Sequence, residues 1–112
     1  MDFKRKNVFL SGAVTGMPNY NRDAFEKAEM HAYANGASYV YNPLSLAPIG
    51  NEDYMTHEQY MLRTIHKLTN LSRPFDLLML LQGWEKSAGA CIERDVAIAC
   101  GIEILELQTC SS

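Results

Sequence analysis

Short apolar runs alternate with stretches of helical periodicity along this chain. Apolar runs bounded by turn-forming residues predict four strands, over residues 7–10, 38–42, 76–82 and 102–107. The third of these runs is almost continuously apolar, which is typical of a strand covered on both faces. Between the strands, apolar residues spaced three and four apart predict three helices, over residues 22–35, 56–68 and 91–100.

The first predicted helix has recognisable signals at both ends. Phe25, Ala28 and Ala32 lie on one face, so we expect that face in the core. Asn21 precedes the helix and is the expected N-cap, because asparagine is a favoured residue there. Gly36 follows the helix, at the position where a left-handed C-terminal cap favours glycine.

The second predicted helix begins with two start signals. Thr56 and Gln59 have the spacing of a capping box, and Met55 and Tyr60 have that of a hydrophobic staple. Beyond them, an apolar stripe is expected to face the core, formed by Met61, Ile65 and Leu68.

The third predicted helix is expected to bury one stripe and to end at Gly101. The stripe consists of Ile92, Val96, Ala99 and Cys100.

In the third helix, Ile98 falls almost opposite this stripe, and Tyr60 and Leu62 lie outside the stripe of the second helix. Apolar residues on a second helix face predict a homodimer or higher symmetric oligomer, with Ile98 and part of residues 54–68 at the contact. Scattered exposed apolar residues, which need no explanation, are the alternative.

Strands that alternate with helices predict an α/β fold, a single domain with a parallel sheet of four to five strands flanked by helices. Ligands of such sheets bind at the carboxyl ends of the strands, where the strand order reverses. The first and third strands are the expected neighbours at that reversal. The turns that follow them, at residues 11–16 and 83–89, are therefore the expected site.

Composition narrows the function classes. The chain has 112 residues and a net charge of −3, which argues against a general nucleic-acid binder. No apolar run approaches the ~20 residues of a membrane helix and no signal peptide is visible, so we expect a cytoplasmic protein. The three cysteines form no CxxC pair and the three histidines lack metal-ligand spacing, so we expect free thiols, no metal site and no cofactor.

The turn at residues 83–89 is the first candidate binding element. Free amides at a helix start attract anions, glycine lets an oxygen approach closely, and a serine hydroxyl adds a donor, so Ser87 and Gly89 are candidate anion ligands. Alternatively, Ser87 is only the N-cap of the next helix. Trp84 could stack on a base or pack on the core, and packing is the commoner use.

Glu93 is the candidate catalytic residue. It lies at the edge of the apolar stripe of the third helix, where a carboxylate would be near the cleft and partly desolvated. Such a group is suited to acid, base or nucleophile chemistry. The alternative is a surface glutamate paired with Arg94 or another neighbour.

The turn at residues 11–16 has two glycines and two hydroxyls, in Ser11, Gly12, Thr15 and Gly16. It matches neither the dinucleotide-binding pattern GxGxxG nor the phosphate-binding pattern GxxxxGK[ST]. It could supply donors to a ligand or serve only as a tight turn.

Several motifs together resemble a known family. They are FLSGAVTG at residues 9–16, NP at 42–43, YMLR at 60–63, GWEKSAGA at 83–90 and the glutamate at 93. They resemble the DUF4406 group of bacteria and phages, which is similar to nucleoside 2-deoxyribosyltransferases and 2′-deoxynucleoside 5′-monophosphate N-hydrolases. The resemblance implies one flavodoxin-like, nucleoside deoxyribosyltransferase-like domain over residues 1–112.

The resemblance also implies roles for the candidate residues. Glu93 matches the glutamate that attacks C1′ of the sugar and forms a glycosyl-enzyme intermediate. Ser87 and Gly89 match the residues that bind the 5′-phosphate in the hydrolases, and residues 11–16 match the turn along the sugar and base. The implied partner is a nucleoside or nucleoside monophosphate. Relatives are usually homodimers that complete each site across the interface.

The chain departs from the family pattern at two positions, Thr64 and Cys91. The enzymes place an aspartate after the YMLR run, where this chain has Thr64, and a hydroxyl cannot replace a carboxylate in proton transfer at neutral pH. Cys91 replaces a second glycine, and residues 69–73 resemble a short insertion.

Three hypotheses of function follow. The first is an N-glycosidase or deoxyribosyltransferase, the second is a non-catalytic nucleotide-binding protein on the same scaffold, and the third is an interaction module in which the two turns bind no ligand. Thr64 favours the second hypothesis, and Glu93 in register with Ser87 favours the first.

Overall fold

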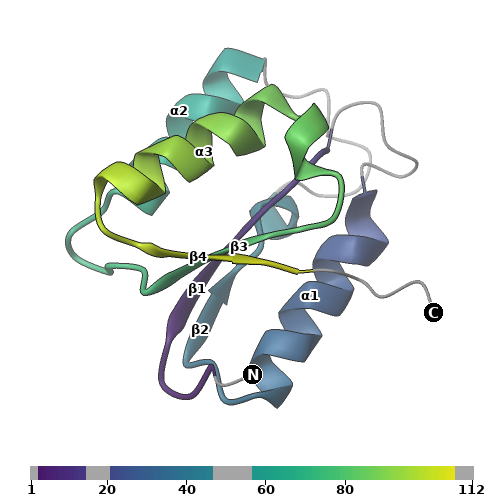
Figure 1. Cartoon of the computed structure of the whole chain (residues 1–112), viewed down its shortest axis with the longest axis vertical. Helices are drawn as coiled ribbons and strands as arrows, with labels where there is room; N and C mark the ends of the chain where they lie inside the picture. The colour runs from purple at the N-terminus through teal and green to yellow at the C-terminus, as the bar shows by residue number, and fades with distance from the viewer. Residues whose placement is uncertain (1–2, 15–20, 47–56, 108–112) are drawn as a thin grey trace.

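Four parallel strands form one sheet in the order β2-β1-β3-β4 (Figure 1). The strands are β1 (Asn7–Ser11), β2 (Tyr39–Tyr41), β3 (Leu77–Leu80) and β4 (Glu103–Glu106). The computed structural model describes residues 3–14, 21–46 and 57–107. Every neighbouring pair of strands is parallel, which confirms the predicted α/β fold with four strands.

In the described part of the chain, three α-helices cover the two faces of the sheet (Figure 1). α1 (Arg22–Ala34) lies on one face, and α2 (His57–Leu68) and α3 (Ala88–Ala99) lie together on the other. The chain steps from β1 outward to β2 and then returns past β1 to β3. The strand order therefore reverses between β1 and β3, as the sequence predicts, and this is where ligands of open α/β sheets bind.

Each strand divides its side chains between two buried clusters, because successive residues of a strand point to opposite faces. Leu10 and Met79 pack with Phe25 of α1. Phe9 and Leu78 face the other way, toward α2 and α3. All four residues of β3 are buried, as expected for a strand that is covered on both faces.

The ends of α1 follow one sequence signal and depart from another. Gly36 has a φ of 101°, and the amide of Ala37 donates to the carbonyl oxygen of Ala32, which together form the predicted left-handed cap. Asn21 stands at the N-cap position, but its side chain makes no capping bond. Instead its amide nitrogen donates to the carbonyl oxygen of Ala13 at 3.0 Å, so Asn21 ties the segment after β1 to the helix start.

The predicted apolar stripe of α3 is wrong. Ile92 is exposed, as are Ala99 and Cys100, and Val96 is half-buried. The buried residues are Gly89, Ala90, Glu93 and Ala97. Apart from the glutamate, these residues are small, so this face allows α3 to approach the sheet closely, and close approach outweighs the hydrophobicity of Ile92.

α2 buries the face that the sequence predicts. Leu68 is buried, and Met61 and Ile65 are half-buried. Met55 and Thr56, which carry the predicted start signals of α2, lie outside the described residues. Among the described residues, no helix is both long and apolar enough to span a membrane.

Candidate functional site

The carboxyl group of Glu93 lies inside the protein, at the end of β1. Glu93 is only 4% exposed, and its Oε1 accepts a hydrogen bond of 2.5 Å from the hydroxyl of Ser11. Ser11 is the last residue of β1 and follows Phe9 by two positions, so it faces α3. Arg94 pairs with Asp95 at 3.5 Å. The alternative of a surface glutamate paired with Arg94 is therefore wrong.

Thr64 brings a second hydroxyl to this carboxyl group, from α2. Thr64 is 1% exposed, and its side chain acts on Glu93 as a hydrogen-bonding group that lowers the pKa of the carboxyl group. Its Oγ1 donates to the carbonyl oxygen of Met61 at 3.2 Å. The lone pairs of the same oxygen are able to accept from a protonated Glu93, whereas donation to the carboxylate requires the hydroxyl to release Met61.

Burial raises the pKa of Glu93 above its ordinary value of 4.5. The cause is desolvation, which penalises the charged carboxylate more than the neutral acid. The hydrogen bonds from Ser11 and Thr64 act in the opposite direction, because they stabilise the charge, but they are the smaller effects. The site therefore holds a carboxyl group whose proton is retained to higher pH than in water.

Tyr41, the last residue of β2, belongs to the same buried region. It pairs in register with Phe9, and the two rings are 4.9 Å apart between centroids. Burial raises the pKa of Tyr41 to about 12, with further contributions from Glu93 and then Tyr39, while Arg63 lowers it. Glu93 thus acts electrostatically on the Tyr41 hydroxyl, which links β2 to the carboxyl site.

Gly12 lies where the ends of β1 and β3 come close together. A Cβ at this position would lie 3.0 Å from the Cβ of Leu81, so a larger residue would require Leu81 to shift by a few tenths of an ångström. The amide of Leu81 also donates to the carbonyl oxygen of Ser11 at 2.8 Å. Thr15 and Gly16, the other candidates in this turn, lie outside the described residues.

The turn before α3 uses Ser87 as a helix cap. The Ser87 hydroxyl accepts from the amide of Ala90 at 3.1 Å, so the capping role of Ser87 is confirmed. α3 begins at Ala88, three residues earlier than predicted, and Gly89 is part of its buried face. The helix offers no intrahelical acceptor to the amides of Ala88 and Gly89. A ligand is able to accept from those two amides.

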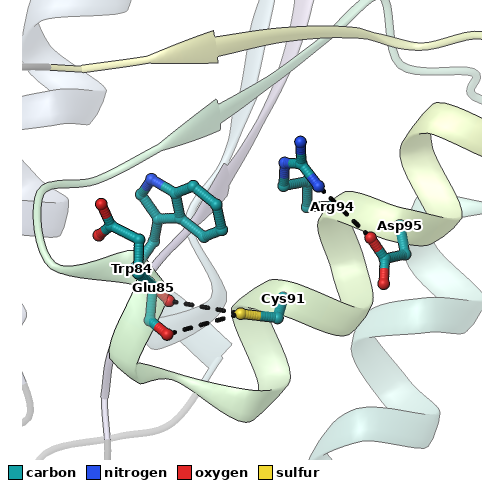
Figure 2. Close-up of polar contacts among 5 residues, drawn as sticks. All are labelled: Trp84, Glu85, Cys91, Arg94 and Asp95. Atoms are coloured by element: carbon teal, nitrogen blue, oxygen red, sulfur yellow. Dashed lines mark hydrogen bonds and ion pairs between the residues drawn. The ribbon is translucent and has the colours of Figure 1, made fainter.

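Trp84 lies on the flank of α3 that is nearer β4 (Figure 2). Its indole Nε1 donates to Glu106 of β4 at 3.1 Å, and the Arg94 guanidinium lies 5.5 Å from the ring centroid. Figure 2 shows the Cys91 sulfur directed at the carbonyl oxygens of Trp84 and Glu85, at 3.9 and 3.7 Å. Trp84 also packs against the buried cluster under α2 and α3, so the structure gives it the packing role.

Comparison with known proteins assigns the family. The model of a domain of unknown function, DUF4406, matches residues 6–106. The chain belongs to the DUF4406 family. No curated protein and no solved structure matches it.

The DUF4406 motifs named from the sequence have different structural roles. Ser11 and Glu93 come from separate motifs and meet in one hydrogen bond. Asn42 is buried, donates to Glu29 at 3.1 Å and accepts from the amide of Leu44, so it joins β2 to α1. The motifs of Ser11 and Glu93 therefore meet at the carboxyl site, whereas the motif of Asn42 stabilises the packing of β2 against α1.

Sequence reasoning missed Tyr41 as a member of the site and noted Thr64 only as a departure from a family pattern. The signal for Tyr41 was its position at the carboxyl end of the second strand, where side chains can face a ligand. That signal is weak, because an aromatic residue in a strand usually only packs.

Proposed function

We propose that this DUF4406 protein cleaves the N-glycosidic bond of a nucleoside or nucleoside monophosphate, as an N-glycosidase or a 2-deoxyribosyltransferase. One observation supports the proposal above the others. A buried carboxyl group, Glu93, is hydrogen-bonded by Ser11 at the end of β1, where the strand order reverses. Desolvated carboxyl groups at such positions are typical of catalytic sites.

In the proposed reaction, a Glu93 carboxylate oxygen bonds to C1′ of the sugar. The C1′–N bond breaks, its electron pair leaves with the base, and the base nitrogen takes up a proton from solvent water. Water or the nitrogen of a second base then attacks C1′, the C1′–O bond to Glu93 breaks with its electron pair returning to the carboxylate, and the proton of the attacking group passes to solvent. Forming a covalent intermediate splits one difficult displacement into two easier ones.

In the same proposal, the start of α3 binds the 5′-phosphate of a monophosphate substrate. The amides of Ala88 and Gly89 point out of the first helical turn, where the helix dipole favours an anion. Gly89 lies four residues before Glu93, so it is about 6 Å away along the helix axis on the same face. Ser11 and Gly12 would then lie along the sugar and base.

A second candidate is a nucleotide-binding protein without catalysis. The observation that favours it is the buried Thr64, which stands beside Glu93 where the similar enzymes have an aspartate. A threonine does not transfer protons at neutral pH. Burial also keeps Glu93 protonated to higher pH, and a neutral carboxyl group is a poor nucleophile.

Incubation with a panel of nucleosides and nucleoside monophosphates, followed by chromatography of released base, separates the two candidates. We expect wild-type protein to release base, and Glu93→Ala to reduce the rate by a factor on the order of 10³ or more. Glu85→Ala, at an exposed glutamate in the preceding turn, is the matched control and should keep the wild-type rate.

Binding of a nucleoside or monophosphate without release of its base would support the second candidate. A Glu93→Ala protein that releases base at the wild-type rate would refute the nucleophile assignment.

We also propose that the protein forms a homodimer or a higher symmetric oligomer. Leu62 on α2 is 74% exposed and Ile98 on α3 is 50% exposed, and the two helices cover the same face of the sheet. Apolar side chains on the outside of both helices favour a partner surface there.

A further inference from the structure

The Tyr41 side chain is buried, but its hydroxyl has no hydrogen-bond partner among the described residues. Only 3% of Tyr41 is exposed. Buried side-chain polar atoms nearly always have a partner, so an unpaired hydroxyl calls for a physical explanation. A group that bonds to a ligand is one such explanation, because its partner arrives only when the site is filled.

The surroundings of Tyr41 hold its ring in one place. The ring contacts Phe9 at 4.9 Å and Phe75 at 6.3 Å between centroids, and the Lys67 ammonium lies 5.5 Å from its centroid. Aromatic neighbours on the strand and in the core leave the ring little freedom to turn the hydroxyl toward another partner.

Tyr41 lies next to the carboxyl site. It pairs with Phe9, and Ser11 stands two residues further along β1 on the same face of the sheet. Glu93, bonded to Ser11, is close enough to raise the pKa of Tyr41. The unpaired hydroxyl and the buried carboxyl group therefore belong to one region, at the carboxyl ends of β1 and β2.

Burial and charged groups of α2 and α3 act on this hydroxyl and leave it a neutral donor. Glu93 from α3 raises the pKa of Tyr41 and Arg63 from α2 lowers it, while burial has the largest effect. With a pKa of about 12, Tyr41 keeps its proton at neutral pH. Ser11 already donates to Glu93, whereas the Tyr41 hydroxyl is a donor without a partner among the described residues.

We propose that Tyr41 is a ligand-binding residue whose hydroxyl donates a hydrogen bond to an acceptor atom of the nucleoside, next to the bond that Glu93 cleaves. This inference rests on the proposed function and deepens it. The ligand supplies the partner that the hydroxyl lacks, and the hydroxyl orients the nucleoside against Glu93. A site built to bond a ligand in this way discriminates against ligands without the acceptor.

The test compares Tyr41→Phe with wild-type protein, and Tyr39→Phe is the matched control from the same face of β2. Two quantities are measured: the thermal unfolding midpoint without ligand, and the affinity and kcat/KM for the nucleosides and monophosphates of the panel. We expect Tyr41→Phe to unfold at the wild-type temperature or above, because no hydrogen bond is lost. We expect its affinity or kcat/KM to fall about tenfold, and Tyr39→Phe to retain both.

The outcomes separate this inference from the function on which it rests. Tyr41→Phe with wild-type affinity and turnover overturns the inference and leaves the proposed function standing. A large drop in its unfolding temperature without ligand also overturns the inference, since the hydroxyl would then have a partner inside the protein. Wild-type protein that binds no member of the panel overturns both proposals. Binding without cleavage, weakened by Tyr41→Phe, supports the inference and refutes only the catalytic step.

Discussion

At the scale of single residues, two opposed effects act on the pKa of Glu93. Desolvation favours its neutral form, whereas the hydroxyls of Ser11 and Thr64 favour its charged form. Desolvation is the larger effect, so the carboxyl group holds its proton more tightly in the folded protein than in the unfolded chain. A carboxyl group with a raised pKa links stability to pH in a direction opposite to that of a carboxylate in a salt bridge.

This linkage predicts the pH dependence of stability. Between the ordinary carboxyl pKa of 4.5 and the raised pKa of Glu93, the folded state binds more protons than the unfolded state. The Glu93 contribution to stability is therefore fully present below the ordinary value and is lost as the pH rises through the raised one. Glu93→Gln removes this titration, so its free energy of unfolding should fall less than that of wild type over this range.

Urea unfolding at a series of pH values measures the effect. The control is Glu85→Gln, at an exposed carboxyl group, whose pH dependence should follow wild type. If the curves for Glu93→Gln and wild type run parallel through this range, the carboxyl group is not held neutral by burial.

At the scale of elements, the start of α3 has two separable roles. Ser87 caps the helix through Ala90, and the proposed phosphate site lies on the amides of Ala88 and Gly89. Capping requires an acceptor on the side chain, whereas phosphate binding requires that no negative charge stands there.

Ser87→Asp is expected to separate these roles. Aspartate is as good a cap as serine, so stability should change by less than about 0.5 kcal/mol, whereas Ser87→Ala should lose about 1 kcal/mol. The added charge should weaken binding of a nucleoside monophosphate and leave binding of the uncharged nucleoside nearly unchanged. Calorimetric titration of both ligands provides the comparison. Equal loss of affinity for both ligands would place the phosphate elsewhere.

At the scale of the whole molecule, the crossovers of the chain assemble the site. Ser11, Tyr41, Thr64 and Glu93 come from β1, β2, α2 and α3, which are separated along the sequence. α2 and α3 cover the sheet face to which Ser11 and Tyr41 point (Figure 1). These four residues meet only because the connections between the strands place α2 and α3 over this face of the sheet.

Sedimentation of the whole protein tests the proposed oligomer. The chain has a mass of 12.6 kDa, so we expect wild-type protein at micromolar concentration to sediment at twice that mass or more. Ile98→Asp should reduce it to the monomer, because a charge buried at an apolar contact is costly. Leu71→Asp, at an exposed leucine beyond the end of α2, is the control and should leave assembly unchanged. A wild-type monomer would refute the oligomer.

The sequence by itself determined most of the elements of this protein. Apolar runs gave the four strands to within one or two residues at each end, and the glycines at 36 and 101 ended two helices with a positive φ. These features are local: they depend on side-chain alternation and on the backbone freedom of glycine, and both can be read within a few residues. The reversal between β1 and β3 followed from the order of strands and helices.

Only the tertiary structure decided which face of α3 points inward and what Glu93 meets there. Hydrophobicity favoured Ile92, but close packing on the sheet selected Gly89, Ala90 and Ala97 and carried Glu93 inside with them. The bond from Ser11 to Glu93 joins residues 82 positions apart, and no local pattern encodes such a distance. The buried hydroxyl of Tyr41 likewise depends on the strand register and on the helices above it, because burial is a property of the packed molecule.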